Sequence, residues 1–254
     1  MELIIIGSGT GIPLNNRASP SLALIVAGDP ILFDIGPGTM RQLTRGGIDY
    51  EKIGRIFITH FHPDHTADLI HFLFATKNSS TLKNKRPFII TGPSGLLDFI
   101  KRLQDLYDEW LTLPPDIMSI EELDVKDVIE KDYHNYKITA RPTKHTHNSI
   151  AYRVEDRSGK SIVFSGDTGV CEEIVDLSRG VDLLVLECSF PDGQEFDWHL
   201  TPSQAGRIAT LAGVNRLILT HFYPECLATD IAAQCRKTYS GELTLGSDLV
   251  HIHI

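Results

Sequence analysis

The segment His60–His65 reads H-F-H-P-D-H and carries four side chains that can bind a metal ion. It follows an apolar run that predicts a strand, and in extended backbone His60 and His62 point to the same side and can hold one ion together. The proline then turns the chain, so that Asp64 and His65 face a neighbouring position from the start of a helix. Imidazole and carboxylate ligands suit zinc, manganese or iron better than calcium. The segment therefore predicts a metal site, and a solvated His-rich loop is the less favoured alternative.

The elements that position this segment are short and mixed in type. Apolar runs bounded by turns predict two series of strands, with helical patterns between and after them, and the second series begins near residue 136. Asp116–Val128 is acidic and weakly periodic and predicts a helix or cover segment, whereas Leu249–Ile254 alternates apolar residues with histidine and predicts an edge strand. No linker separates the two halves. We therefore expect one α/β domain over residues 1–254, a four-layer αββα sandwich of two mixed sheets with helices outside.

Composition restricts the partners and the compartment. The net charge of −9, from 33 acidic against 24 basic residues, argues against a large nucleic-acid footprint, because such affinity rests mostly on neutralising phosphates. The four cysteines form no paired motif, which indicates a reducing compartment. The first residues lack the basic region of a signal peptide, and no apolar run approaches the roughly 20 residues of a membrane span. We expect a cytoplasmic protein without membrane contact.

The H-x-H-x-D-H pattern of this segment resembles the signature of the metallo-β-lactamase superfamily. The resemblance extends from the glycine-rich turn Gly7–Gly11 to His221. That superfamily has an αββα sandwich with its metals at one edge of the two sheets, where a third histidine, a bridging aspartate and a last histidine complete the site. The resemblance implies two divalent metal ions, with zinc expected first and manganese or iron as alternatives. It implies His60, His62 and His145 on one ion, Asp64, His65 and His221 on the other, and Asp167 between them.

The third histidine requires a choice between His145 and His147. The closest resemblance is to the ribonuclease Z-like branch, where the ligand histidine lies six residues before a Gly-Tyr-Arg strand. Here Ala151–Arg153, which reads A-Y-R, stands in that place, and counting back six residues leads to His145. The resemblance therefore favours His145, with His147 as the alternative. Asp34, in a D-x-G-x-G-T stretch, is expected to be a buried structural carboxylate rather than a ligand.

Two further stretches resemble motifs of the same branch. The stretch E-C-S-F begins at Glu187 and the stretch H-L-T-P-S-Q-A begins at His199, whose counterpart is thought to assist the leaving group. His199 just precedes the expected N-cap of a helix, Thr201, near a positive dipole end that favours phosphate oxygens. The resemblance implies that His199 donates a proton to the leaving group or stabilises its charge, and that Glu187 holds the His199 imidazole in place. It implies that Asp64 orients a metal-bridged hydroxide. A surface histidine beside a helix cap is the alternative for His199.

The expected activity follows from this site. A carboxylate bridge between two metals favours phosphoryl chemistry, so we expect a metal-dependent phosphodiesterase that uses a metal-bridged hydroxide. The alternatives are a ribonuclease Z-type tRNA 3′ endonuclease and a lactone, thioester or sulfate-ester hydrolase. A non-catalytic metal-binding module is least favoured, because no ligand position is lost.

The substrate expectation rests on an inserted arm. Ribonuclease Z carries a substrate-grasping arm between the Tyr-Arg strand and the Gly-Asp turn, but here only Arg153–Gly166 fills that interval. The arm is therefore absent. The missing arm and the acidic net charge together predict a small phosphodiester or ester substrate. They argue against the binding of extended nucleic acid. A homodimer is compatible with the sequence.

Overall fold

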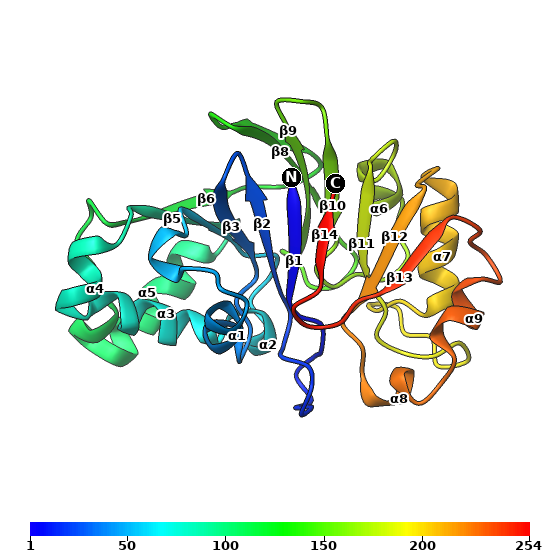
Figure 1. Ribbon diagram of the computed structural model, residues 1–254, viewed down its shortest axis with the longest axis horizontal. Helices are drawn as coiled ribbons and strands as arrows, with labels where there is room; N and C mark the ends of the chain where they lie inside the picture. The colour runs from blue at the N-terminus through cyan, green and yellow to red at the C-terminus, as the bar shows by residue number, and fades with distance from the viewer.

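The computed structural model describes residues 1–254 and contains two seven-stranded sheets, packed face to face between two groups of helices (Figure 1). The strand order is β14-β1-β2-β3-β4-β5-β6 in the first sheet and β13-β12-β11-β10-β9-β8-β7 in the second. The strands of the first sheet are β1 (Glu2–Gly7), β2 (Ser21–Val26), β3 (Asp29–Phe33), β4 (Arg55–Phe57), β5 (Phe88–Pro93), β6 (Met118–Leu123) and β14 (His251–His253). Those of the second are β7 (Ile129–Asp132), β8 (Tyr136–Pro142), β9 (Ile150–Asp156), β10 (Ser161–Phe164), β11 (Leu183–Glu187), β12 (Arg216–Thr220) and β13 (Glu242–Leu245).

The helices divide between the two outer faces in chain order (Figure 1). The first sheet is covered by α1 (Thr39–Arg45), α2 (Pro63–Thr66), α3 (Asp68–Lys77), α4 (Ser79–Asn84) and α5 (Leu96–Tyr107), with the 3-10 turns η1 (Tyr50–Lys52) and η2 (Asp108–Leu111). On the side of the second sheet lie α6 (Glu172–Leu177), α7 (Pro202–Leu211), α8 (Pro224–Leu227) and α9 (Ile231–Cys235). The layers are therefore α, β, β and α.

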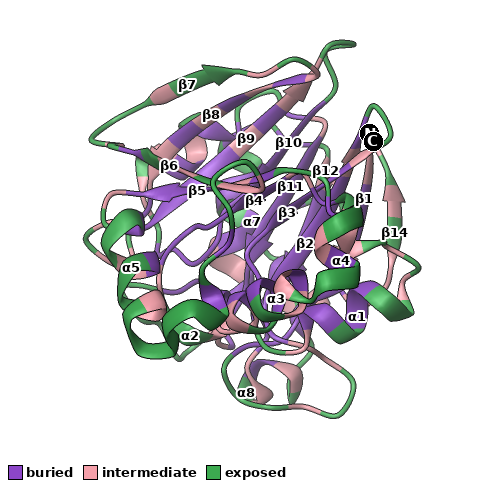
Figure 2. Cartoon of the chain, turned by 90° about the vertical axis from the view of Figure 1, so that its left-hand side faces the viewer, coloured by how far each residue is buried: buried purple, intermediate pink, exposed green.

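Burial on both faces explains the strongly apolar strands. In β1, Leu3 and Ile5 belong to the apolar cluster between the two sheets, whereas Ile4 and Ile6 belong to the cluster beneath the first group of helices. Successive side chains of a strand point to opposite faces, so a strand with helices on one side and a sheet on the other is apolar throughout. The central strands are buried along most of their length, whereas the edge strands β7 and β14 are largely exposed and α4 and α5 expose one side (Figure 2). This confirms the αββα sandwich expected from the sequence.

One local expectation was wrong. Asp116–Val128 contains the strand β6, which pairs in parallel with β5, rather than a helix. Its acidic residues are tolerated because this strand lies at the edge of the sheet, where one face is partly exposed, and pairing to a distant strand leaves no periodic signal. The C-terminal edge strand is confirmed, since β14 pairs with β1.

None of the helices has the length and apolar character to span a membrane, and the cytoplasmic location stays a prediction.

Candidate dinuclear metal site

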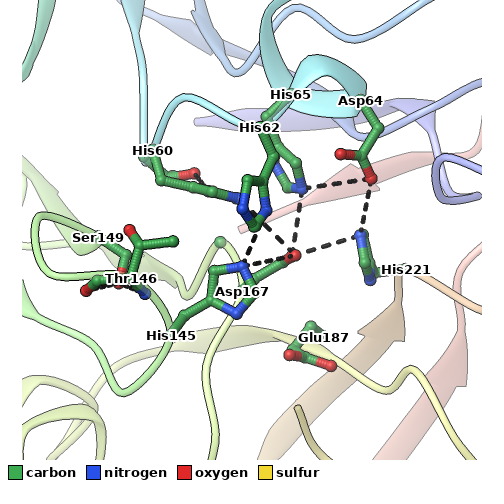
Figure 3. Close-up of polar contacts among 12 residues, drawn as sticks. His60, His62, Asp64, His65, His145, Thr146, Ser149, Asp167, Glu187 and His221 are labelled. Carbon is green, nitrogen blue, oxygen red and sulfur yellow. Dashed lines mark hydrogen bonds and ion pairs between the residues drawn. The ribbon is translucent and has the colours of Figure 1, made fainter. Parts of the chain in front are cut away.

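The residues implied as ligands come together at one edge of the sandwich, from loops that follow strands of both sheets (Figure 3). The segment His60–His65 lies between β4 and the end of α2, and His145 lies between β8 and β9. Asp167 follows β10, and His221 directly follows β12. Loops beyond the carboxyl ends of neighbouring strands meet at one edge of a sheet, which is why residues so distant in sequence share a site.

Asp167 lies between two groups of histidines, and each of its carboxylate oxygens faces one group. Oδ2 lies 3.8 Å from Nε2 of His60 and 3.6 Å from Nε2 of His145. Oδ1 lies 3.2 Å from Nε2 of His65 and 3.3 Å from Nε2 of His221. A carboxylate placed in this way can bind two cations at once, one through each oxygen.

Asp64 completes the second group from the opposite side. Its Oδ2 lies 3.5 Å from Nε2 of His221 and 3.8 Å from Nε2 of His65. Donor atoms 2.0–2.1 Å from a tetrahedral zinc ion are about 3.4 Å apart, so these separations fit ligands of one cation. In the first group, Nε2 of His145 and Nδ1 of His62 are 3.1 Å apart. The donor atoms thus form two sets, each of a size that fits one cation.

Four of the donor atoms also lack other partners. Nε2 of His60, His65 and His221 and Oδ1 of Asp167 are buried without a hydrogen bond. Buried polar atoms are almost always paired, because leaving one unpaired costs about 1–3 kcal/mol. These four unpaired atoms point into the same small volume. A divalent cation bound at each set would supply the missing partner.

A buried carboxylate orients two of the proposed ligands. Asp34 follows β3, is fully buried, and accepts hydrogen bonds from Nδ1 of His65 at 2.7 Å and from the backbone N–H of Thr59 at 2.8 Å. The hydroxyl of Thr59 contacts both Asp34, at 2.8 Å, and Nδ1 of His60, at 3.0 Å. Such contacts fix the ring orientation and leave Nε2 free for a metal. The structural role expected for Asp34 is therefore confirmed.

The same charges set the protonation of this cluster. Burial disfavours a charged His65, but Asp167 and Asp34 outweigh burial and hold the pKa of His65 well above its usual value. Burial likewise disfavours a charged Asp167, but His221 and His65 hold the pKa of its carboxyl well below the usual range. Carboxylates that stay ionised in a buried cluster are ready ligands for a cation.

Close backbone approaches and strain hold the ligand loops in place. A Cβ at Gly36 would lie 1.9 Å from the carbonyl oxygen of Asp64, so only glycine lets the loop after β3 pack against α2. His221 has a φ of 60°, a left-handed conformation that is unfavourable for a residue with a side chain. Strain of this kind persists where the surroundings fix the conformation, and it is concentrated at functional sites.

The geometry favours His145 over His147 as the third histidine. Nδ1 of His145 donates a hydrogen bond to the carbonyl oxygen of Trp198 at 3.0 Å, which leaves Nε2 turned toward Asp167. His147 is exposed and is not among the residues grouped around a metal position. The assignment of the individual ligands nevertheless stays a prediction.

We expect His145→Ala to lower the metal content by about one ion per chain, because it removes one ligand of the first set. His147→Ala, the matched control two residues away, should keep the full metal content. Elemental analysis of the purified variants after dialysis against buffered zinc measures the difference. Loss of metal in His147→Ala with none in His145→Ala would reverse the assignment.

His199 lies beside the proposed metal ligands and is held by Glu187. Its Nδ1 donates a hydrogen bond to Oε1 of Glu187 at 2.7 Å, and the centre of its ring is 5.0 Å from that of His145. Burial disfavours its charged form, but Glu187 outweighs burial and raises the pKa of His199. The expected helix cap is present, since Thr201 caps α7. The structure thus brings His199 and Glu187 together at the site, rather than leaving His199 on an unrelated surface.

Ser189 is a positioning residue that the sequence did not reveal. Its hydroxyl donates to Oε2 of Glu187 at 2.7 Å and lies 2.9 Å from Nδ1 of His221 and 3.3 Å from Nδ1 of His199. It therefore connects the proposed catalytic pair to a proposed ligand. The only signal in the sequence is its place two residues after Glu187, on the same side of an extended segment.

The comparisons with known proteins agree with this geometry. The sequence profile of the beta-lactamase superfamily domain matches residues 30–222, which is more than half of the chain. The chain belongs to the beta-lactamase superfamily. This superfamily member shares 27% identity over 305 aligned positions with ribonuclease Z from Methanothermobacter thermautotrophicus, covering 100% of this chain and 97% of that protein.

Two solved structures are similar over nearly the whole chain. Human tRNase Z, short form, has a TM-score of 0.83 and 27% identity, covering 100% of this chain and 99% of that one. The metallo-beta-lactamase fold protein YhfI from Bacillus subtilis has a TM-score of 0.85 and 22% identity, covering 99% and 98%. These likenesses confirm the superfamily and the ribonuclease Z-like branch that the sequence predicted, and with them the expectation of a metal-dependent hydrolase.

The expectation about partners was wrong. We expected a small substrate and an unfavoured role for extended nucleic acid, but the relatives that match the chain from end to end are named ribonuclease Z and tRNase Z, after RNA substrates. Net charge averages over the whole surface, so a value of −9 does not describe the field at a single site such as this His/Asp cluster. The net charge of the chain therefore does not exclude an RNA substrate.

The short connection that suggested a small substrate is nevertheless real. Only residues 157–160 separate β9 from β10, which form an antiparallel hairpin. The alignment with the Methanothermobacter relative runs over 305 positions, about fifty more than the 254 residues of this chain. A ribonuclease Z-like protein of this kind must bind its substrate without an arm at this hairpin.

Proposed function

We propose that this protein is a metal-dependent phosphodiesterase that cleaves RNA, with precursor tRNA as the first substrate to test. The observation that carries the proposal is the position of Asp167, whose two carboxylate oxygens face separate sets of histidines. Phosphoryl transfer spreads negative charge over several oxygens, and a site built for two cations suits that charge distribution. The full-length similarity to ribonuclease Z supports RNA as the substrate class.

The proposed ligands form the two sets described above, joined by Asp167. Their mixture of imidazole and carboxylate favours zinc, with manganese or iron as alternatives. Bound to these residues, two divalent ions would supply an activated water and positive charge for the attacking and leaving oxygens. The proposed ligands are His60, His62 and His145 for one ion, Asp64, His65 and His221 for the other, and Asp167 for both.

Three side chains of the protein would move or hold protons during the reaction. Asp64 faces His65 and His221 through Oδ2, so its other oxygen can accept a hydrogen bond from the attacking water and orient it. His199 uses Nδ1 to contact Glu187, so its Nε2 can give a proton to the leaving oxygen. The carboxylate of Glu187 stabilises the charged imidazole before that transfer and fixes its direction.

A substrate panel tests the proposal. We expect the zinc-loaded protein to cleave precursor tRNA and bis-p-nitrophenyl phosphate and to leave lactones intact, because the site is matched to phosphoryl oxygens. Products are measured by gel electrophoresis for RNA and by absorbance for the chromogenic ester. Hydrolysis of lactones with no cleavage of either phosphodiester would refute the proposal. Asp167→Ala protein, purified in parallel, reports contaminating nuclease.

A further inference from the structure

Four aromatic side chains form a continuous surface beside the proposed catalytic histidine. We call Phe190, Phe196, Trp198 and Tyr223 the aromatic wall. Phe190 and Tyr223 stack with ring centres 4.7 Å apart and planes at 17°. The centre of the Phe196 ring lies 4.5 Å from that of Phe190 and 5.9 Å from that of Trp198. The wall therefore runs unbroken over four rings.

One end of the wall touches the site, and the other is open to solvent. The ring centre of Phe190 lies 5.8 Å from that of His199, and the ring centre of Tyr223 lies 5.8 Å from that of His221. Phe196 and Trp198 are 41% and 51% exposed. Single apolar residues on a surface need no explanation, but a connected aromatic surface that begins at the proposed catalytic residue does.

The backbone that carries Trp198 is fixed on the metal side. Its carbonyl oxygen accepts the hydrogen bond from Nδ1 of His145 at 3.0 Å. The preceding residue, Asp197, pairs with Lys144 at 3.1 Å, and Phe196 forms a β-bridge with His199. The wall is thus held in register with the proposed metal ligands, and a rigid surface loses little freedom when a ligand binds.

The chemistry of the wall fits a nucleobase better than a phosphate. The carboxylate residues of the same loop are Asp192, Glu195 and Asp197, and the nearby Lys144 is already paired with Asp197. Phosphates would be repelled there. Aromatic faces, in contrast, stack on any base, and this contact is the usual way in which proteins bind unpaired nucleotides.

We propose that the aromatic wall is a stacking subsite for the base of the nucleoside that carries the leaving oxygen. The leaving oxygen is assigned because His199, which contacts Phe190, is positioned to protonate it. This inference rests on the proposed function, since it concerns an RNA substrate of the same site. It also gives a protein without an arm at the β9–β10 hairpin a means of holding unpaired RNA.

Intrinsic fluorescence tests the stacking without relying on cleavage. The chain has two tryptophans, Trp110 and Trp198, and both are exposed, at 56% and 51%. In Trp110→Phe protein, we expect precursor tRNA to quench the emission of Trp198, and less so when the nucleotide on the leaving side of the scissile phosphate is abasic. In Trp198→Phe protein, the matched control, the emission of Trp110 should not change.

Kinetics with the same RNAs provide the second readout. An abasic nucleotide on the leaving side should raise KM roughly tenfold, as expected for one lost stacking contact, whereas one on the other side should change it little. Phe196→Ala and Trp198→Ala should raise KM for intact RNA to a similar extent and no longer respond to the abasic nucleotide. Trp198→Phe should restore most of the response, and Trp110→Ala should behave as the unaltered protein.

The outcomes separate this inference from the proposed function. Quenching by RNA without cleavage would overturn the proposed function and leave the base-binding surface supported. Cleavage of RNA with no quenching and an unchanged abasic response in Phe196→Ala and Trp198→Ala would overturn the wall as a base subsite. A change of molecular mass in these variants on size-exclusion chromatography, with an unchanged abasic response, would make the wall an interface between copies of the chain and would also overturn it.

Discussion

Asp167→Ala should lose metal and activity together, with turnover reduced by at least roughly a thousandfold. The variant removes the only side chain that faces both sets of donor atoms. Without the bridging carboxylate, each set retains three protein ligands but loses the negative charge that holds two cations close together. Because the metals supply most of the expected acceleration, their loss should remove most of it. Elemental analysis and the rate of phosphodiester hydrolysis are measured on the same preparation.

Asp167→Asn is the matched variant. The Asn amide keeps one oxygen that can bind a metal but lacks the negative charge of the carboxylate, so we expect about one ion per chain instead of two. Circular dichroism of both variants checks that the fold persists, since the apolar core between the sheets does not include Asp167. Two tightly held ions in Asp167→Ala protein would contradict the bridging role.

His199→Ala should keep both metal ions and lose roughly a hundredfold to ten-thousandfold in turnover, the range typical of a lost general acid. Nδ1 of His199 is already used by Glu187, and its proposed task is to protonate the leaving oxygen. Some leaving groups, such as p-nitrophenolate, depart without a proton. Turnover of a substrate with such a leaving group should fall much less than turnover of RNA. The variant is compared on RNA and on bis-p-nitrophenyl phosphate at equal metal content.

Two results would change this assignment. Full activity of His199→Ala on RNA would mean that the residue takes no part in the reaction. Loss of an ion would mean that His199 is a ligand, since it also lies close enough to Asp167 and His221 to share a cation with them. Glu187→Gln should reduce turnover less than His199→Ala does. The amide can still hydrogen-bond to His199, but the charge that raises the pKa of His199 is removed.

Local sequence alone predicts one half of the candidate metal site and the type of strand that makes up the sheets. The spacing of His60, His62, Asp64 and His65 around a strand end and a helix start predicts which side chains can act together, because strand and helix geometry is local. The apolar runs predict strands buried on both faces, since period and burial are properties of each segment. The αββα sandwich was expected from these segments, and the superfamily from the resemblance of the H-x-H-x-D-H segment to a known signature.

Only the tertiary structure decided how the distant parts meet. The approach of Asp167 to histidines from both sheets, the contact of Ser189 with Glu187 and His221, and the pairing of β6 with β5 all depend on how the sheets are ordered and packed. The aromatic wall is another case, since Tyr223 and Phe190 stack across loops that follow different strands. Contacts between residues far apart in the chain leave no periodic trace in a single sequence, because they are fixed by packing rather than by local geometry.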